Sequence, residues 1–476
     1  MLDRGTFPMR MLYLLLCPAV MAGCTVGPDY KPVSNKPITL TQQLPSQLYS
    51  ADRLQQDWWR QFKDSQLDAL IEQALASNYD IRIAQTRMSE ARAMLDEREL
   101  DKWPTVTAGA DYSRSMSQVN AGPIGERNLS KTYSAGLDAQ WEIDLFGRLK
   151  RLTQAAEARS EAVADDTLQV RIVVVAEVAN NYFQWYGAQQ QLSVVRANLA
   201  NQDAAVTVVR SMVEHGRGNP DELESAEALR ASIMASLAPL QTRSDLARFR
   251  LAVLAGVRPD QLVALEKATP LPPLGTRLPI GDIGDLLRRR PDVASAERTL
   301  AATNADVGAI TAELYPRIDL GGFLGFVALR GGDWGHGSSR AFSVVPSVSW
   351  PALHLASVKA RQRVAQAHYQ GAQAQYELVA LRAIEEIEAA LTTYSQSQER
   401  LRHLAESAEH SKQAASLAGI RYKAGQASYL VELDARRNLF AYQDALAQAD
   451  TATFLDVVSL YKALGGGWQA PQPASN

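Results

Sequence analysis

The most restrictive feature of this sequence is a period-two alternation of apolar and polar residues that occurs in only two places. The first is residues 104–145 and the second is residues 317–350. In each place two alternating runs flank a glycine-containing loop, at 119–131 and 330–340, which is the pattern of a β-hairpin. The rest of the chain reads as helical. Isolated hairpins with one apolar face cannot stand alone in lipid and would aggregate in water, because their edges stay unpaired.

Four strands are too few to close a membrane barrel, since the smallest barrels use about eight strands and are filled by their own side chains. Three copies of the chain would supply about twelve strands, an even number such as bacterial barrels prefer. The runs are long enough to cross a bilayer at a tilt. Aromatic residues that could form an interfacial girdle lie near the strand ends: Tyr112, Tyr133, Trp141 and Trp350. The alternative is a pair of soluble hairpins packed on helices.

An internal repeat contains the two hairpins. Trp103-Pro104 before the first hairpin matches Tyr315-Pro316 before the second, and Val213-x-x-Gly216 matches Tyr422-x-x-Gly425 at an offset of 209 residues. We therefore predict two copies of the same order of elements, namely a helix, a hairpin, a long helix, a turn and a returning helix.

The long helices set the expected organisation of the chain. Residues 147–213 contain no proline and, after the initial Gly147, a single glycine, Gly187, so they predict a helix of about 100 Å. Such helices must pair as coiled coils or stand side by side as the wall of a tube. The predicted segments are a signal peptide at 1–23, an N-terminal segment at 24–65 that wraps an equatorial region, a first repeat at 66–260, a linker at 261–281, a second repeat at 282–464 and a C-terminal tail at 465–476. The first repeat contains hairpin 104–145, long helix 147–213 and tip turn 214–221. The second repeat contains hairpin 317–350, long helix 352–423 and tip turn 424–429.

The N-terminus carries the pattern of a lipoprotein signal. Two arginines precede a short apolar stretch at residues 11–21, which ends in Ala22-Gly23-Cys24. Small residues directly before a cysteine have the form of a bacterial lipobox, so we predict cleavage after residue 23 and acylation of Cys24. Thr25 follows in place of an aspartate, which favours sorting to the outer membrane. The alternative is an ordinary signal peptide with a chance cysteine.

Composition excludes several classes of protein. The chain has 49 basic and 52 acidic side chains and a net charge of −3, so it lacks the cationic surface that nucleic-acid binding requires. No run of 18 consecutive apolar residues occurs, which excludes a polytopic helical membrane protein. Cys17 and Cys24 are the only cysteines, and the first would leave with the signal peptide. The mature chain would therefore have no disulfide.

Five separated motifs carry a family resemblance. They are Thr25-Val26-Gly27-Pro28-Asp29-Tyr30, Trp141-Glu142-Ile143-Asp144-Leu145-Phe146-Gly147-Arg148, Leu254-Ala255-Gly256-Val257-Arg258-Pro259, Arg289-Arg290-Pro291-Asp292-Val293 followed by Ala296-Glu297, and Leu464-Gly465-Gly466-Gly467-Trp468. Together these motifs resemble the outer-membrane factors of tripartite RND-type efflux pumps, in the NodT-type lipoprotein branch of the TolC superfamily. The resemblance covers nearly the whole mature chain and is close to drug-efflux outlet lipoproteins.

The resemblance implies an α+β membrane protein with a TolC-like fold. The expected assembly is a homotrimer with one shared 12-stranded transmembrane β-barrel, four strands from each chain, and a long periplasmic α-helical barrel. Its expected place is the outer membrane, with a lipid anchor and an extension into the periplasm. The expected partners are outer-membrane lipid, a periplasmic adaptor (membrane fusion) protein and an inner-membrane RND-type transporter, and no nucleic acid.

The implied function is that of an exit duct. It would conduct drugs or other small amphiphilic compounds passively to the exterior after an adaptor opens a periplasmic gate. Two alternatives stay open: a type I secretion outlet for polypeptides, and a lipid-anchored coiled-coil scaffold in the periplasm that conducts nothing.

The resemblance also implies a gate in the second repeat. Leu430 would form an apolar constriction, Asp434 an acidic ring, and Tyr422 and Arg437 a latch between helices. Three aspartates around a narrow axis would attract cations, whereas a ring of leucines resists wetting. The alternative for Asp434 is a solvated acid on an amphipathic helix.

The two tip turns are the expected contacts of the adaptor, through Gly216 and Gly218 in the first repeat and Gly425 and Gln426 in the second. The two repeats differ where the gate would be built. Tyr422 is matched by Val213, and Asp434 by Ser225. Such a difference is expected if only the second-repeat helices move.

Sequence motifs of enzymes do not occur. The six histidines are scattered without an HExxH pattern, and neither a Walker A motif nor a GxSxG motif is present. The cluster Glu385-Glu386-Ile387-Glu388 is interpreted as a charged helix face. We therefore predict a protein that is not an enzyme and has no catalytic residue, bound metal or cofactor.

Overall fold

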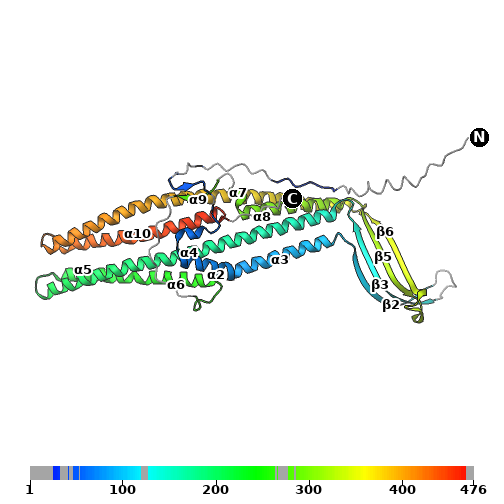
Figure 1. The fold of residues 1–476 in the computed structure, drawn as a ribbon, viewed down its shortest axis with the longest axis horizontal. Helices are drawn as coiled ribbons and strands as arrows, with labels where there is room; N and C mark the ends of the chain where they lie inside the picture. Colours follow the sequence, from blue (N-terminus) through cyan, green and yellow to red (C-terminus); the bar gives the residue numbers. More distant parts are fainter. Residues whose placement is uncertain are drawn as a thin grey trace, which may run out of the picture. The chain divides into compact units, whose positions relative to one another are not determined.

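The computed structural model describes residues 25–32, 41, 45, 47–52, 54–118, 127–262, 265, 277–282 and 286–467. The predicted signal peptide, the predicted lipidation residue Cys24, most of the linker 261–281 and residues 468–476 of the tail lie outside these residues. The chain forms two compact units, drawn as a ribbon in Figure 1. We call residues 1–33, 87–163 and 295–377 the sheet unit, and residues 34–86, 164–294 and 378–476 the helical unit.

The sheet unit is organised around one antiparallel sheet. Its strands are β2 (Thr105–Gln118), β3 (Arg127–Ile143), β5 (Arg317–Ala328) and β6 (Arg340–Ser349), in the order β2-β3-β5-β6. The two hairpins come from different repeats and join through β3 and β5, with Trp141 opposite Leu320. The first loop is shorter than its composition predicts, because ladder pairing with β2 extends β3 back to Arg127, which lies opposite Gln118. Strands β2 and β6 are the edges.

One face of this sheet is apolar and exposed in the single chain. The register places Val106, Leu137, Leu324 and Phe342 on this face, since alternate residues point to opposite sides of a strand. Leu324 is 66% exposed and Phe342 is 81% exposed. Soluble monomers rarely expose a contiguous apolar surface of this kind, so the face requires either lipid or a partner.

The ends of the two hairpins are fastened to the preceding helices in the same way. The indole N–H of Trp141 donates to the carbonyl of Lys102 at 2.9 Å, and that of Trp350 donates to the carbonyl of Leu314 at 3.0 Å. Both carbonyls belong to the residue before an aromatic-proline pair, so the matching motifs of the two repeats make matching contacts. The two tryptophans satisfy a polar group at the strand ends while their rings stay half exposed.

The chain after the predicted lipidation site docks on helices of the sheet unit. The sheet unit takes parts of α3 (Tyr79–Leu100), α4 (Arg148–Glu214), α8 (Pro291–Ala312) and α9 (Leu355–Lys423). The buried guanidinium of Arg151 donates to the carbonyls of Val26 and Gly27 and to the carboxylate of Asp29, which it approaches to 2.7 Å. Gly27 has a φ of +90°, and a Cβ there would come within 2.6 Å of the Cα of Gly308. The motif that begins at Thr25 is therefore a docking segment for α4 and α8.

The remaining elements of the described chain are short strands and helices around the long ones. The helical unit contains the helices α2 (Ser65–Ser77), α5 (Pro220–Ala235), α6 (Leu237–Leu254), α7 (Leu286–Arg289), α10 (Tyr429–Ala463) and η1 (Trp58–Phe62). It also contains a parallel strand pair, β1 (Tyr49–Ser50) with β4 (Leu278–Pro279). The sheet unit adds the short helices η3 (Gly331–Asp333) and η4 (Gly337–Ser339). In the described part of the chain, none of the helices combines the length and the apolar content that membrane-spanning helices need.

The core of the helical unit is aromatic. Trp58 stacks on Tyr461 with ring centroids 5.0 Å apart, and Phe183 stacks on Phe454 at 5.0 Å, with Phe62 edge-on to both phenylalanines. These five residues come from η1, α4 and α10, so the core joins the N-terminal segment to one long helix and to the last helix. Stacked and edge-on aromatic pairs add to the free energy gained from apolar burial alone.

The returning helices of the two repeats differ. The sequence predicts one returning helix in each repeat, and the second repeat forms a single 35-residue helix, α10. In the first repeat the helix ends at Ala235 and α6 begins at Leu237. Pro239 explains this break, because it has no N–H and its ring would clash with the carbonyl of Ala235 in a continuous helix. The compact units also differ from the two repeats, since each unit takes segments from both.

Four helix ends show the repeat most clearly. After α4 and α9, Gly216 and Gly425 adopt φ values of +70° and +68°; after α6 and α10, Gly256 and Gly465 adopt +71° and +82°. Each pair is 209 residues apart. In each case the N–H of the next residue donates to the carbonyl five residues back, such as that from Arg217 to the carbonyl of Met212 at 2.8 Å. This left-handed cap favours glycine, because a Cβ strains the backbone there.

Alanine substitution at two of these glycines should lower the free energy of unfolding by different amounts, because one position has backbone strain alone and the other has strain and a steric clash. Gly216→Ala should cost about 1–2 kcal/mol, because a Cβ there has no heavy atom within 4 Å and only the left-handed backbone is strained. Gly256→Ala should cost about 2–5 kcal/mol, because its Cβ would lie 2.4 Å from the carbonyl oxygen of Ser77. Thermal unfolding followed by circular dichroism measures the difference, and equal losses would contradict this structure.

Candidate functional site

The face of the sheet opposite the apolar one carries all the acidic residues of the four strands. Asp111, Asp138, Glu142 and Asp319 lie on this polar face by register, together with a single base, Arg317. The rest of the face is largely serine, threonine and glycine. A surface of this kind can line a water-filled passage, and its net negative charge would favour cations over anions.

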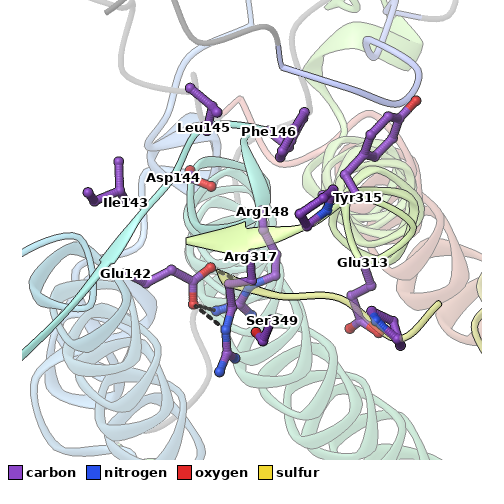
Figure 2. A pocket seen from close by; sticks show the side chains of 13 residues that line it. Glu142, Ile143, Asp144, Leu145, Phe146, Arg148, Glu313, Tyr315, Arg317 and Ser349 are labelled. Carbon is purple, nitrogen blue, oxygen red and sulfur yellow. Dashed lines mark hydrogen bonds and ion pairs between the residues drawn. The ribbon is translucent and has the colours of Figure 1, made fainter. Parts of the chain in front are cut away.

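Glu142 anchors the junction between the sheet and helix α4. Its carboxylate accepts two hydrogen bonds from Arg148, at 2.8 and 2.6 Å, in the bidentate arrangement that guanidinium favours (Figure 2). Figure 2 also shows Arg317 beside this pair, and its guanidinium bonds to Asp319 at 3.1 Å. Beside the pair is a pocket of about 310 Å³ with the stacked rings of Phe146 and Tyr315 on one side. The Trp141–Arg148 motif is therefore a structural corner.

The predicted adaptor-contacting residues lie in two similar turns. Residues 215–219 follow α4, and residues 424–428 follow α9. Gly216, Gly425 and Gln426 are exposed, and Gly218 is half-buried against Val213. Both turns therefore offer open backbone to a partner, as the prediction requires.

In the first turns of α10, the predicted gate residues lie on the exposed side of the helix and their neighbours lie on the buried side. Tyr429 and Leu433 are buried, at 2% and 1% exposure. Leu430 is 60% exposed, and the side chain of Asp434 is also 60% exposed. Four residues separate Leu430 from Asp434, so the two share one face of the helix, and this face points away from the core. The structure thus brings the predicted apolar constriction and the predicted acid together on an exposed stripe.

Tyr422 joins the end of α9 to the end of α4. Its hydroxyl donates to the sulfur of Met212 at 3.5 Å, and its ring lies 5.5 Å from that of Tyr429. Burial raises the pKa of both tyrosines, so their hydroxyls stay protonated at physiological pH. Tyr422 therefore contacts a neighbouring helix, as a latch would.

Arg437, the other predicted latch residue, makes no such contact in the described chain. Its guanidinium lies 3.9 Å from the carboxylate of Asp434 on the same helix. The neighbouring Arg436 instead donates to the backbone carbonyl of Asn201 on α4 at 3.4 Å. It also donates twice to Glu432, at 2.6 and 3.0 Å. Within one chain the arginine that links α10 to α4 is therefore Arg436.

Glu432 is a buried carboxylate that sequence reasoning missed. Only 5% of its side chain is exposed, and a Cβ on Gly419 of α9 would lie 3.4 Å from its carboxylate. The side chain therefore lies where α9 passes close to α10. Glu432 and Arg436 also line a cleft of about 650 Å³ between the ends of α4, α9 and α10, and Tyr422 and Met212 lie on its wall. The four-residue spacing of acid and base could have identified the pair, but nothing in the sequence indicates its burial.

Metal-binding and histidine clusters do not add to this site. Among the described residues, no group of three or more His, Cys, Asp or Glu side chains could hold a metal ion. His403 lies 2.9 Å from Glu399 on the same exposed helix face, and His215 contacts the carbonyl of Ser211. These are local helix contacts.

Comparison with known families identifies the chain. Its sequence matches the family described as "Outer membrane efflux protein" over residues 70–257 and 283–466. The chain belongs to the outer membrane efflux protein family. The predicted resemblance is therefore confirmed, and each matched stretch holds one hairpin with one long helix.

Similar proteins cover nearly the whole of this efflux protein. It is 29% identical over 455 residues to the cation efflux system protein CusC of Escherichia coli O6:H1, covering 94% of this chain and 97% of CusC. It is 30% identical over 415 residues to the solvent efflux pump outer membrane protein SrpC of Pseudomonas putida, covering 86% of this chain and 87% of SrpC. Among solved structures, the outer-membrane channel OprN matches with a TM-score of 0.91 and 41% identity, covering 94% of this chain and 100% of that chain.

These likenesses confirm the predicted fold class, a TolC-like arrangement of long helices and four strands in each chain, and an outer-membrane efflux channel as its function. The relatives are channels rather than enzymes, and they are outer-membrane proteins. The names of the relatives mention cations and solvents. Similarity within the family therefore does not identify the compounds that this chain conducts.

The buried pair on α10 generates a stability prediction. Glu432→Gln should destabilise the start of α10 by about 2–3 kcal/mol, because it leaves Arg436 without its carboxylate in a site that is only partly solvated. Asp434→Asn is the matched control and should cost less than about 0.5 kcal/mol, since that acid is exposed and its ion pair is long. Hydrogen–deuterium exchange of the first turns of α10 is the measurement, and equal protection in the two variants would rule out a stabilising role for the buried pair.

Proposed function

We propose that this protein is the exit duct of a tripartite efflux system, built as a homotrimer with a shared 12-stranded barrel in the outer membrane. The observation that carries the proposal is the four-stranded sheet with an exposed apolar face and two unpaired edges. Such a sheet is stable neither in water nor alone in lipid, because every backbone polar group in a bilayer needs a partner.

Closure between copies satisfies both requirements at once. Strand β2 of one copy would pair with β6 of the next, so three copies would give a ring of twelve strands without edges. The apolar face would then contact lipid, and the polar face with Asp111, Asp138, Glu142 and Asp319 would line the passage. The long helices α4 and α9, with 67 and 69 residues, would continue as the wall of a helical barrel in the periplasm.

The exposed stripe of Leu430 and Asp434 supports the proposed gate. In a trimer, three copies of each residue would face a common axis, where leucines resist wetting and aspartates bind cations. Tyr422, with Met212, would hold α9 to α4 in the closed state. Arg437, which makes no cross-helix contact within one chain, would be available to an adjacent copy as the second part of the latch.

The partners and cargo follow from the same assembly. A periplasmic adaptor would bind the open turns at Gly216, Gly218, Gly425 and Gln426, and an RND-type transporter in the inner membrane would supply the cargo. Drugs or other small amphiphilic compounds are the proposed cargo, and the similarity to an outer membrane protein of a solvent efflux pump supports this class of compound. Type I secretion of polypeptides would use the same wall with other partners.

A lipid anchor at Cys24 completes the proposal. Thr25 contacts Gly147, where a Cβ would come within 2.7 Å of the threonine methyl group, four residues after the end of β3. An acyl chain on the preceding residue would therefore begin where the sheet meets the helices. That is the level at which a barrel strand leaves the membrane.

Planar bilayers test the duct and its gate. The purified protein should run as a heat-modifiable trimer and open discrete conductance steps, which a non-conducting scaffold would not do. Asp434→Ala should weaken block by divalent cations severalfold, because it removes three negative charges at the constriction. Asp221→Ala in the exposed first turn of α5 is the control and should leave block unchanged. Unaltered block and opening in Asp434→Ala would remove this acid from the gate.

Mass spectrometry of the mature N-terminus tests the anchor. The first peptide should begin at residue 24 and carry three acyl chains, two on a thioether-linked glycerol and one on the amine. Cys24→Ala should carry none, and acid hydrolysis of this variant should release no fatty acid. A mature wild-type protein without fatty acids would refute the lipoprotein assignment.

A further inference from the structure

Charge on the sheet is divided between its two faces. By register, the charged residues on the apolar face are Arg114, Arg127, Lys131 and Arg340, and this face has no acid in the four strands. The opposite face has four acids and one base. The separation is not expected of a random exposed sheet, where charges of both signs are mixed.

The four basic residues also lie at one end of the apolar face. Each is near the hairpin loops, whereas the ends of the strands that meet the helices carry Ile143, Ile318 and Val348 on this face. The basic residues therefore occur only in the loop-side half of this face, where Met116 and Leu129 lie among them, and we call this half the basic border. If the sheet crosses a membrane, one leaflet meets this border and the other does not.

Two of these bases are placed against each other. Arg114 and Lys131 are directly opposite on β2 and β3, and both are exposed. Like charges directly opposite on a sheet are destabilising. None of the four bases forms an ion pair with a carboxylate in the portion of the chain that the structure describes. An external anion between Arg114 and Lys131 would relieve their repulsion.

Arg340 stands beside an apolar groove on the same face. The groove has a volume of about 850 Å³ and is lined by Leu137, Leu324, Phe342 and, from the loop after β5, Trp334. A site with an apolar floor and a cationic rim matches a lipid with an anionic head group, since the acyl chain and the phosphate each find their counterpart. Free phosphate would leave the floor uncovered.

We propose that this surface binds the phosphorylated glycolipid of the outer leaflet, lipopolysaccharide, through its lipid A phosphates. The inference rests on the proposed function, because it requires the sheet to span the outer membrane with its loops outside. Phosphates of lipid A would lie against Arg114, Lys131 and Arg340, and an acyl chain would lie in the groove below Trp334. Both edge strands carry a basic residue, so in the closed trimer the basic border would continue from copy to copy.

Lipid binding to the delipidated trimer in a neutral detergent tests the proposal. Native mass spectrometry would measure binding of bisphosphorylated lipid A, of its fully dephosphorylated form and of phosphatidylglycerol. The variant Arg114→Gln/Lys131→Gln/Arg340→Gln should bind bisphosphorylated lipid A about a hundredfold more weakly, at roughly fivefold for each base removed. Arg317→Gln, which removes the base on the opposite face, is the control and should bind lipid A as the wild type does.

Three outcomes would overturn the proposal. They are equal binding of bisphosphorylated and dephosphorylated lipid A, equal binding of phosphatidylglycerol, and unchanged lipid A binding by the triple variant. Conductance in phosphatidylethanolamine bilayers separates this failure from that of the proposed function. A trimer that conducts but does not prefer the phosphorylated glycolipid refutes only the lipid surface, whereas a protein that forms neither trimer nor conductance refutes the duct itself.

Discussion

The constraint on which this structure depends is the incomplete sheet. Four antiparallel strands present an apolar face in which Phe342 is 81% exposed, and the two edge strands β2 and β6 have unpaired backbone groups. A single chain cannot cover that face, since no helix of the described chain packs over Phe342 or Leu324. In the proposed trimer, the free energy that stabilises the sheet would come from lipid contact and from pairing between copies. Assembly would then be a part of folding rather than a later step.

Much of the chain near the sheet serves to hold its helix-side end in place. Trp141 and Trp350 bond to backbone carbonyls before the two hairpins, and Glu142 clamps Arg148 at the start of α4. The segment at Thr25 is then fixed by the buried Arg151. Motifs that identify the family are thus mostly corners and docking points. These motifs fix the positions of the strands and carry little information about the cargo. This agrees with the names of the relatives, which mention different cargo.

The sequence is sufficient to predict the individual hairpins and long helices, but it does not predict which strands far apart in the chain pair with each other. Alternation predicted both hairpins, and the absence of proline predicted α4, because these signals depend on residues close together in the chain. The pairing of β3 with β5 joins the two repeats, and no local pattern encodes it. Pro239 is an ordinary helix-breaking signal, but the internal repeat by itself predicts one returning helix in each half of the chain.

Helix phase explains why the site was only partly predictable. Arg436 and Arg437 are adjacent, and one step along a helix turns the side chain by about 100°. The helix turns Arg436 toward Glu432 and the backbone of Asn201, whereas Arg437 stays on the exposed side with Asp434. The resemblance predicts gate roles for residues on the exposed side only, namely Leu430, Asp434 and Arg437.

The buried pair on the opposite side has a different consequence for gating. If α10 moves away from α4, the contact of Arg436 with Asn201 must break, while the contact with Glu432 lies within α10 and can move with the helix. Arg436 would then keep a counter-charge throughout the motion, so opening would not leave an unpaired buried charge, the state that is most costly in a protein interior. Movement of α10 against α4 would also have to break the hydrogen bonds of Gln191 with Asp444 and of Asn198 with Gln443, which lie further along the two helices. Gly419 leaves room for the Glu432 carboxylate against α9, since a Cβ there would lie 3.4 Å from it, so the ion pair within α10 fits between the two helices.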